Sequence, residues 1–289
     1  MRYFDLHCDT AFECYRRGLA FENAELAVSA AEGAALEEWK QVFAIWIRDD
    51  EKAPFALYRA ILCDWKQKIR KKPACLTPIL AVEGGAVLED DSERVEQLKQ
   101  DGVRLLTLTW NGENRIAGGA HSTKGLTDFG KEVIAGLNRA GIICDLSHLN
   151  DRSFYAVIER AEHPVATHSN CRAICNVPRN LNDDQLRLIA QKGGLIGLCF
   201  YPLFLGGEGA EALARHLYHL CKLGLEKQVA IGSDFDGAVM SPELDRLSKL
   251  PACAEKLKRL GFEQGLLERF FYENAENYFK TFDKRNGFV

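Results

Sequence analysis

Segments rich in β-forming residues alternate with segments of helical periodicity along most of this 289-residue chain. Several of the β-rich segments are almost continuous apolar runs, as is typical of parallel strands that are buried on both faces. The alternation predicts eight short strands, at residues 3–9, 41–47, 76–83, 103–110, 142–148, 164–168, 195–200 and 229–234.

The segments between the strands carry the signals of helix ends. Thr127 precedes one of them in the position of an N-cap, and Gly141 follows its end, where a left-handed residue commonly closes a helix. Pro73 stops another helix shortly after its basic end. Helices are therefore expected at residues 55–72, 92–100, 127–140, 150–161, 183–192 and 211–223, followed by one long terminal helix at about 262–279.

Eightfold alternation of strands and helices favours a single (β/α)8 barrel of the TIM type, a fold that typically takes about 250 residues. The competing architecture is a doubly wound open sheet, but no Gly-x-Gly-x-x-Gly motif follows the first strand. No segment has the composition of an interdomain linker, so residues 1–289 are expected to form one domain.

Side chains that can bind a metal stand at the C-terminal ends of five of the predicted strands. In a barrel these ends meet at one mouth, where active sites lie. On the first strand, His7 and Asp9 are two residues apart and therefore share a face, whereas Cys8 points the other way. Together six such residues predict a metal site, namely His7, Asp9, Glu83, His148, His168 and Asp234.

The number of these ligands favours two metal ions. Three histidines and up to three carboxylates exceed the needs of one tetrahedral zinc ion. A glutamate between two ions could bridge them, and a hydroxide held there would be a strong nucleophile at neutral pH. One carboxylate could then remain free of the metals and act as a general acid and base.

The motifs that surround these residues resemble the membrane (renal-type) dipeptidase family of zinc peptidases, within the amidohydrolase-like barrels. The resemblance runs over nearly the whole chain and rests on motifs that are specific in combination and order. They are His7-Cys8-Asp9, Glu83-Gly84-Gly85, Leu106-Thr107-Leu108-Thr109, Asp145 to His148, His168 to Asn180, Asp234-Phe235-Asp236-Gly237, Leu247-Ser248-Lys249 and Asn274.

The resemblance implies a dinuclear zinc dipeptidase with two Zn²⁺ ions per chain. By analogy with the family, His7 and Asp9 would bind one ion, His148 and His168 the other, and Glu83 would bridge them. The implied substrates are small dipeptides, including those with a D-residue on the C-terminal side. The expectation of a homodimer rests on the same resemblance alone.

Two further roles are implied in the same way. Asp234 would carry a proton from the attacking water to the leaving amine, and Arg179 would contact the substrate, since a guanidinium suits a carboxylate. The alternative for Arg179 is a surface or helix-entry arginine. The second carboxylate of the last motif, Asp236, is expected to fix the turn or to support a ligand.

One position departs from the family pattern. Trp110 follows Leu-Thr-Leu-Thr where better-known members have a histidine that touches the substrate near the scissile carbonyl. An indole can donate one hydrogen bond but carries no positive charge. His121, in the loop that follows, is a candidate substitute; its alternative is a solvent-exposed histidine.

Two alternatives to a dipeptidase stay open. One, which Trp110 keeps open, is another amidohydrolase-type reaction on a small amide, ester or lactone. The other is a metal-binding barrel that no longer catalyses, which the presence of all five implied ligands and Asp234 argues against. The remaining tryptophans Trp39, Trp46 and Trp65 are expected in the core.

The composition excludes other classes of function. A net charge of −4 gives no electrostatic reason to expect nucleic acid or an anionic membrane as partner. The longest uncharged stretch, residues 193–207, is shorter than the roughly 18 residues of a membrane-spanning helix. Residues 1–3 lead straight into the first strand without an apolar leader, so a cytoplasmic protein is expected. The ten cysteines include no Cys-x-x-Cys pair and are expected to be reduced, mostly buried and not catalytic.

Overall fold

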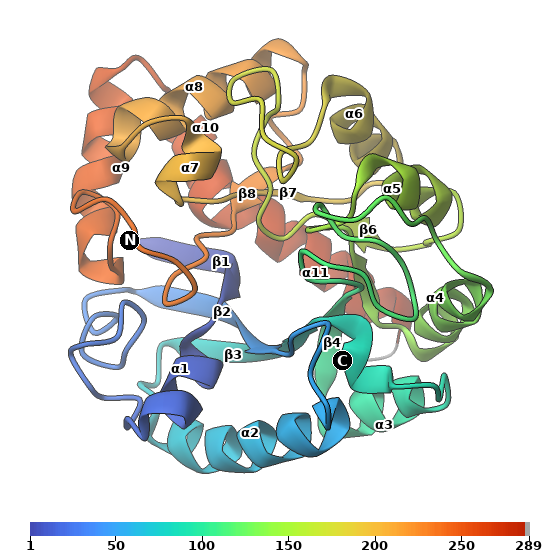
Figure 1. The fold of residues 1–289 in the computed structure, drawn as a ribbon. Coiled ribbons are helices and arrows are strands. Elements are labelled where there is room, and N and C mark those ends of the chain that lie inside the picture. The colour runs from blue at the N-terminus through green and yellow to red at the C-terminus, as the bar shows by residue number, and fades with distance from the viewer. Residues whose placement is uncertain (287–289) are drawn as a thin grey trace.

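Eight parallel strands form a barrel at the centre of the computed structural model, which describes residues 1–286 (Figure 1). Hydrogen-bonded neighbours follow the order β6-β5-β4-β3-β2-β1-β8-β7, so every strand except β6 and β7 has two partners in the sheet. The strands are β1 (Arg2–Cys8), β2 (Glu38–Trp46), β3 (Leu76–Glu83), β4 (Val103–Thr107), β5 (Ile143–Asp145), β6 (Pro164–Val165), β7 (Ile196–Leu198) and β8 (Val229–Ile231).

The barrel closes between β6 and β7. A parallel bridge joins Ala166 to Ile196 just beyond the end of β6. The backbones approach so closely here that a Cβ atom at Gly197 or Gly232 would lie 1.9 or 1.6 Å from the carbonyl oxygen of Thr167. Glycine is therefore required at both positions, and the predicted (β/α)8 barrel is confirmed.

Helices surround the barrel on its outside (Figure 1). The helices of eight or more residues are α1 (Thr10–Arg17), α2 (Pro54–Lys68), α3 (Arg94–Asp101), α4 (Asp128–Ala140), α5 (Asp151–Ile158), α6 (Asp183–Gln191), α8 (Gly209–Lys222), α9 (Leu250–Arg259) and α11 (Asn274–Asn286). Two shorter helices are α7 (Pro202–Leu205) and α10 (Gln264–Glu268). Among residues 1–286, no helix combines the length and the apolar character needed to cross a bilayer.

The terminal helix closes one end of the barrel. Inward-facing apolar residues of the strands, such as Val42 and Leu105, form a cluster that also contains Phe279 and Phe282 of α11. The rings of Phe4 and Phe279 are 5.0 Å apart. Figure 1 shows α11 crossing behind the strands. Because this end is filled by apolar side chains, the open mouth lies at the C-terminal ends of the strands.

A buried carboxylate, Asp145, ties the ends of β4, β5 and β6 together. It accepts hydrogen bonds from the hydroxyl of Thr107 at 2.6 Å, from the backbone N–H of Ser147 at 3.0 Å, and from both the N–H and the hydroxyl of Thr167 at 2.9 and 2.6 Å. These side-chain bonds satisfy backbone groups that would otherwise pair in a strand ladder. They explain why β5 and β6 end earlier than predicted.

A second buried carboxylate, Asp5, plays the same part between β1 and β8. It accepts bonds from the backbone N–H and the hydroxyl of Ser233 at 2.9 and 2.6 Å, from the N–H of His7 at 3.2 Å and from the hydroxyl of Tyr3 at 3.0 Å. Burial raises the pKa of Asp5 despite these donors. The two aspartates therefore hold the backbone on both sides of the mouth.

The first strand is irregular at the point where it reaches the mouth. Leu6 lies in the interior cluster, and strict alternation would turn His7 to the outside. The register between β1 and β2 shifts between Asp5 and Cys8, as in a β-bulge. His7 therefore faces the centre of the mouth, and Cys8 packs in the outer core as predicted.

The terminal helix differs from its prediction. In place of one helix over residues 262–279, the chain forms α10, a π-helical segment over Arg269–Glu273, and α11, which extends to Asn286. Phe270, Phe271 and Tyr272 are three consecutive buried aromatic residues in that segment. A regular α-helix cannot place three successive side chains on one face, and the wider π turn accommodates them.

Helices α1, α7 and α9 have no counterpart among the predicted elements. In α9, Leu250, Cys253 and Leu257 are buried at helical spacing. The sequence therefore carries the apolar periodicity from which this helix could have been predicted. The other helices lie within a few residues of their predicted bounds. Thr127 caps α4 by accepting from the N–H of Gly130, and Gly141 ends it with a positive φ, as predicted.

We expect Asp145→Asn to lower the free energy of unfolding of the metal-free protein by about 2–4 kcal/mol, because an amide cannot accept all four bonds and its N–H₂ group would face hydroxyl donors. Urea unfolding followed by circular dichroism measures this. Asp128→Asn, on the exposed first turn of α4, is the control and should change stability little. Equal stability of the Asp145 variant and the parent would refute the structural role.

Candidate metal centre

The six side chains that predicted a metal site lie together at the mouth of the barrel. They form three overlapping groups, in each of which the potential ligand atoms all lie within 4.8 Å of one another. Glu83 belongs to two of these groups and is 3% exposed. The groups are His7 with Asp9 and Glu83, Glu83 with His148 and His168, and His7 with His168 and Asp234.

Glu83 divides its two carboxylate oxygens between two sets of ligands. Its Oε2 lies 3.5 Å from Nε2 of His7. Its Oε1 lies 2.7 Å from Nε2 of His148 and 3.7 Å from Nε2 of His168. A carboxylate placed in this way can bind one cation through each oxygen.

On the β1 side of Glu83, two buried polar atoms have no hydrogen-bond partner. They are Nε2 of His7 and Oδ1 of Asp9. The other carboxylate oxygen of Asp9 lies 3.4 Å from the same Nε2. Leaving buried polar atoms unpaired is costly, and a cation between them would satisfy both. The donor set, an imidazole and carboxylates, suits zinc.

On the other side, His148 and His168 bring their Nε2 atoms within 2.8 Å of each other. The opposite ring nitrogens are held by the protein. Nδ1 of His148 lies 2.9 Å from Oδ1 of Asn111, and Nδ1 of His168 lies 2.8 Å from the hydroxyl of Thr167. Such contacts fix the orientation of a ring and direct its free nitrogen toward a metal.

Burial raises the pKa of one group of the site and lowers the pKa of another. Burial, with the charges of Asp9 and Glu83 adding to it, raises the pKa of Asp234 to about 8. Burial, assisted by the positive charge of Arg179, lowers the pKa of His148 to about 4. Protein groups alone therefore favour a protonated carboxyl and a neutral imidazole, and a bound cation would favour ionised carboxylates and neutral imidazoles.

The backbone of the site is strained. Among residues 1–286, four non-glycine residues have positive φ, and three of them lie here: His148 at 72°, Asp234 at 64° and Asp236 at 64°. This conformation costs an L-residue roughly 1–2 kcal/mol. Strain of this kind gathers at functional sites, where the surrounding structure imposes it.

Asp236 fixes the last turn of the mouth, as predicted. Its carboxylate accepts bonds from the hydroxyl of Thr10 at 2.5 Å and from the backbone N–H groups of Ala27 and Val28 at 2.7 and 3.3 Å. At Gly237, which follows, a Cβ atom would lie 2.1 Å from Oδ2 of Asp9. The turn therefore leaves room for the ligand and supports it.

A cavity of about 510 Å³ opens above these ligands. Asp9, Glu83, His148 and Asp234 line it together with aromatic side chains from two sides of the barrel. Trp46, at the end of β2, is one of them, so its predicted place in the core is wrong, whereas Trp39 and Trp65 are buried as predicted. The other aromatic residues of the lining are Phe12, Trp110, Tyr201 and Phe204.

Trp110, Arg179 and His121, which were considered as substrate contacts, differ from one another in their burial and position. Trp110 lines the cavity. Arg179 is 5% exposed, so it is not a surface arginine; its Nη2 donates to the carbonyl of His168 at 3.3 Å and its Nε has no hydrogen-bond partner. His121 is exposed and does not belong to the lining, so its substitution for the family histidine gains no support.

The sequence did not predict the roles of three residues near the site. Asn111 holds His148, as described above. The thiol of Cys199 lies 3.6 Å from Oδ2 of Asp234, and Asp49 binds the loop that carries Trp110. Each of the three contacts a residue that is distant in the sequence, so its role could not be predicted from its neighbours. The one available signal was that Asn111 directly follows Trp110. All ten cysteines are unpaired.

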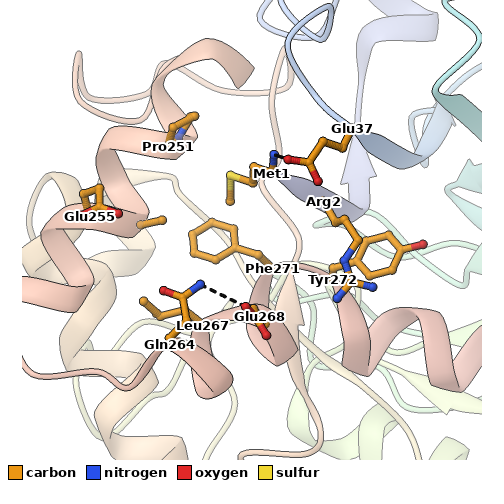
Figure 2. A pocket seen from close by; sticks show the side chains of 11 residues that line it. Met1, Arg2, Glu37, Pro251, Glu255, Gln264, Leu267, Glu268, Phe271 and Tyr272 are labelled. Atoms are coloured by element: carbon orange, nitrogen blue, oxygen red, sulfur yellow. Dashed lines mark hydrogen bonds and ion pairs between the residues drawn. The ribbon is translucent and has the colours of Figure 1, made fainter.

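A second cavity, of about 380 Å³, lies at the opposite ends of β1 and β2 (Figure 2). Phe271 and Leu267 form part of its lining, and the amino group of Met1 pairs with Glu37 at its edge. None of the three ligand groups reaches it. The mouth of the barrel is therefore the candidate site.

The chain is similar in sequence to known proteins. A model of the family described as membrane dipeptidase (peptidase family M19) matches residues 60–285. A protein of Klebsiella pneumoniae, described as an uncharacterized protein in the pqqA 5′ region, is 32% identical over 215 residues, which cover 69% of this chain and 79% of that protein.

Solved structures share the fold. The crystal structure of dipeptidase AC, a metallopeptidase of family M19, has a TM-score of 0.82 at 24% identity over 97% of this chain and 98% of that one. A metallopeptidase from Rhodobacter sphaeroides, solved with a phosphinate mimic of the dipeptide L-Ala-D-Ala, has a TM-score of 0.81 at 22% identity over 97% and 99% of the two chains.

We expect Asn111→Ala to weaken metal binding about tenfold, because His148 loses the contact that orients its ring. Asn111→Asp keeps an acceptor for Nδ1 and should restore most of the affinity. Titration of the metal-free protein with zinc against a chromophoric chelator measures the dissociation constants. Asn138→Ala, which removes a bond to the carbonyl of Arg160 on the outer helices, is the control. Unchanged affinity in Asn111→Ala would contradict the expectation.

Proposed function

The chain belongs to the membrane dipeptidase family, peptidase family M19, and on this premise we propose that it is a zinc-dependent dipeptidase that hydrolyses the peptide bond of small dipeptides. The observation that carries the proposal is the division of Glu83 between two groups of buried ligands. A site built for a single structural ion would need no such bridge. The neighbouring Asp234 supplies the acid and base that hydrolysis requires.

In the proposed enzyme, the mouth would hold two zinc ions. His7 and Asp9 would bind one, His148 and His168 would bind the other, and Glu83, which belongs to both groups of ligands, would serve both. The unpartnered Nε2 of His7 and Oδ1 of Asp9 support this assignment. Bound zinc would supply a Lewis acid for the peptide carbonyl and would lower the pKa of an attacking water.

Asp234 accepts the proton of the attacking water and delivers it to the nitrogen of the leaving amine. Its Oδ1 lies 3.9 Å from Nε2 of His7, and its Oδ2 accepts from the thiol of Cys199. Burial raises the pKa of Asp234 to about 8 in the metal-free protein, and the charge of bound zinc would lower it, so the two effects oppose each other. A group whose pKa is close to the working pH is efficient in both directions of proton transfer.

Arg179 binds the C-terminal carboxylate of the dipeptide. Its guanidinium is buried, lies 5.0 Å from the centre of the Phe204 ring and has an Nε without a partner. Its positive charge also acts on Asp234 and Glu83, so it lies within electrostatic reach of the ligands. A buried arginine this close to the metal centre favours short substrates that carry a carboxylate next to the scissile bond.

We further propose that a D-residue is accepted on the C-terminal side. The Rhodobacter sphaeroides metallopeptidase of the same fold was solved with a mimic of L-Ala-D-Ala, which supports the inclusion of such substrates. The second candidate is hydrolysis of another small amide, an ester or a lactone. It is favoured by Trp110, which cannot provide the positive charge that a histidine offers near the scissile carbonyl.

We expect Asp234→Asn to lower kcat on dipeptides at least about 100-fold while two zinc ions remain bound, because an amide cannot transfer the proton. Hydrolysis of L-L and L-D dipeptides by zinc-reconstituted protein, together with metal analysis, measures both quantities. The exposed variant Asp128→Asn is the control. If the parent protein holds two zinc ions and cleaves no dipeptide, the proposal fails, and amides, esters and lactones are tested next.

A further inference from the structure

We propose that Trp46 and Trp110 bind the side chain of the substrate's N-terminal residue, and that the enzyme prefers dipeptides with an aromatic or large apolar residue at that position. The inference rests on the proposed dipeptidase function and adds to it a class of substrate. It uses the residue that departs from the family pattern, Trp110, and a tryptophan that the sequence had placed in the core.

The two indoles form one continuous aromatic wall with Phe12. The rings of Trp46 and Trp110 are 5.1 Å apart at an interplanar angle of 72°, and those of Phe12 and Trp46 are 5.0 Å apart at 86°. All three residues are half-buried and line the cavity above the ligands. Edge-to-face contacts of this kind hold the rings in place and leave their free faces for an apolar partner.

The loop that carries Trp110 is fixed by Asp49. This carboxylate accepts from the backbone N–H of Trp110 at 3.1 Å, from that of Gly112 at 2.9 Å and from the amide of Asn114 at 3.1 Å. Asn114 also donates to the carbonyl of Leu108 at 2.9 Å, on the other side of the loop. The wall is thus in place before substrate arrives, which reduces the entropy lost on binding.

Apart from the candidate metal ligands, several charged groups near this wall are occupied by protein partners. Both oxygens of Asp49 accept from the loop, as described above. Arg16 donates two hydrogen bonds of 2.7 Å to Glu13. The carboxylate of Asp236 is bound by Thr10 and by two backbone N–H groups. A charged side chain placed against the indoles would lose water and find no free counter-charge among these groups.

The position of Arg179 decides which end of the dipeptide meets the wall. Arg179 and Phe204 follow β6 and β7, whereas Trp46 ends β2 and Trp110 follows β4 on the other side of the barrel. With its carboxylate at Arg179 and its scissile bond over Glu83, a dipeptide directs its N-terminal residue toward the indoles. The C-terminal residue instead lies beside Tyr201 and Phe204.

The test compares kcat/KM for L-phenylalanyl-L-alanine, L-leucyl-L-alanine, L-alanyl-L-alanine and L-aspartyl-L-alanine with zinc-loaded protein. Burial of a large apolar side chain should favour the first two over alanyl-alanine by about tenfold or more. Aspartyl-alanine should be the poorest substrate. Trp110→Ala and Trp46→Ala should each bring the ratio of phenylalanyl-alanine to alanyl-alanine close to one, and Trp110→Phe should retain most of it.

Phe204→Leu, on the opposite wall, is the matched comparison: it should alter rates but preserve the ratio between N-terminal residues. Circular dichroism establishes that each variant is folded, and Trp46→Ala carries the test if Trp110→Ala does not fold. Equal kcat/KM for phenylalanyl-alanine and alanyl-alanine in the parent, or an unchanged ratio in a folded tryptophan variant, overturns the inference and leaves the dipeptidase function intact. Failure to cleave any dipeptide overturns both.

Discussion

Two buried carboxylates, Asp5 and Asp145, hold the mouth of this barrel together. Each accepts four hydrogen bonds at the place where strand pairing stops, Asp5 between β1 and β8 and Asp145 across β4, β5 and β6. The backbone that follows these bonds carries the side chains of the candidate metal centre. A polar network that is fully satisfied in this way is rigid and specifies one arrangement. The geometry of the candidate site therefore depends on residues that would touch neither metal nor substrate.

Rigid support is needed because the site itself is unfavourable to the protein alone. Carboxylates and imidazoles crowd into a small buried volume, two of their polar atoms lack partners, and the backbone at His148 and Asp234 lies in the left-handed region. Such local conflicts are expected at functional sites, where the rest of the fold compensates for them. Bound cations would relieve the charge conflict, which links the stability of the mouth to its occupancy.

The sequence predicted the barrel and the convergence of the six candidate ligands at its mouth for one reason. Strand ends of a barrel converge, so His148 and His168 could be placed together from order along the chain alone. What escaped prediction depends on contacts between distant segments. Trp46 reads as a core residue because its strand is apolar, and only the closed barrel shows that the strand ends at the cavity. The register shift in β1 likewise leaves no trace in the residues themselves, and Asn111 acquires its role only beside His148.

The terminal helix has a consequence for how the protein is made. All eight strands precede α11 in the chain, yet Phe279 and Phe282 belong to the same apolar cluster as Phe4 of the first strand. During synthesis, the base of the barrel therefore stays open to water until α11 has left the ribosome. The nascent chain carries an uncovered apolar surface from the first strand onward, and one of the most distant contacts in the described molecule covers it.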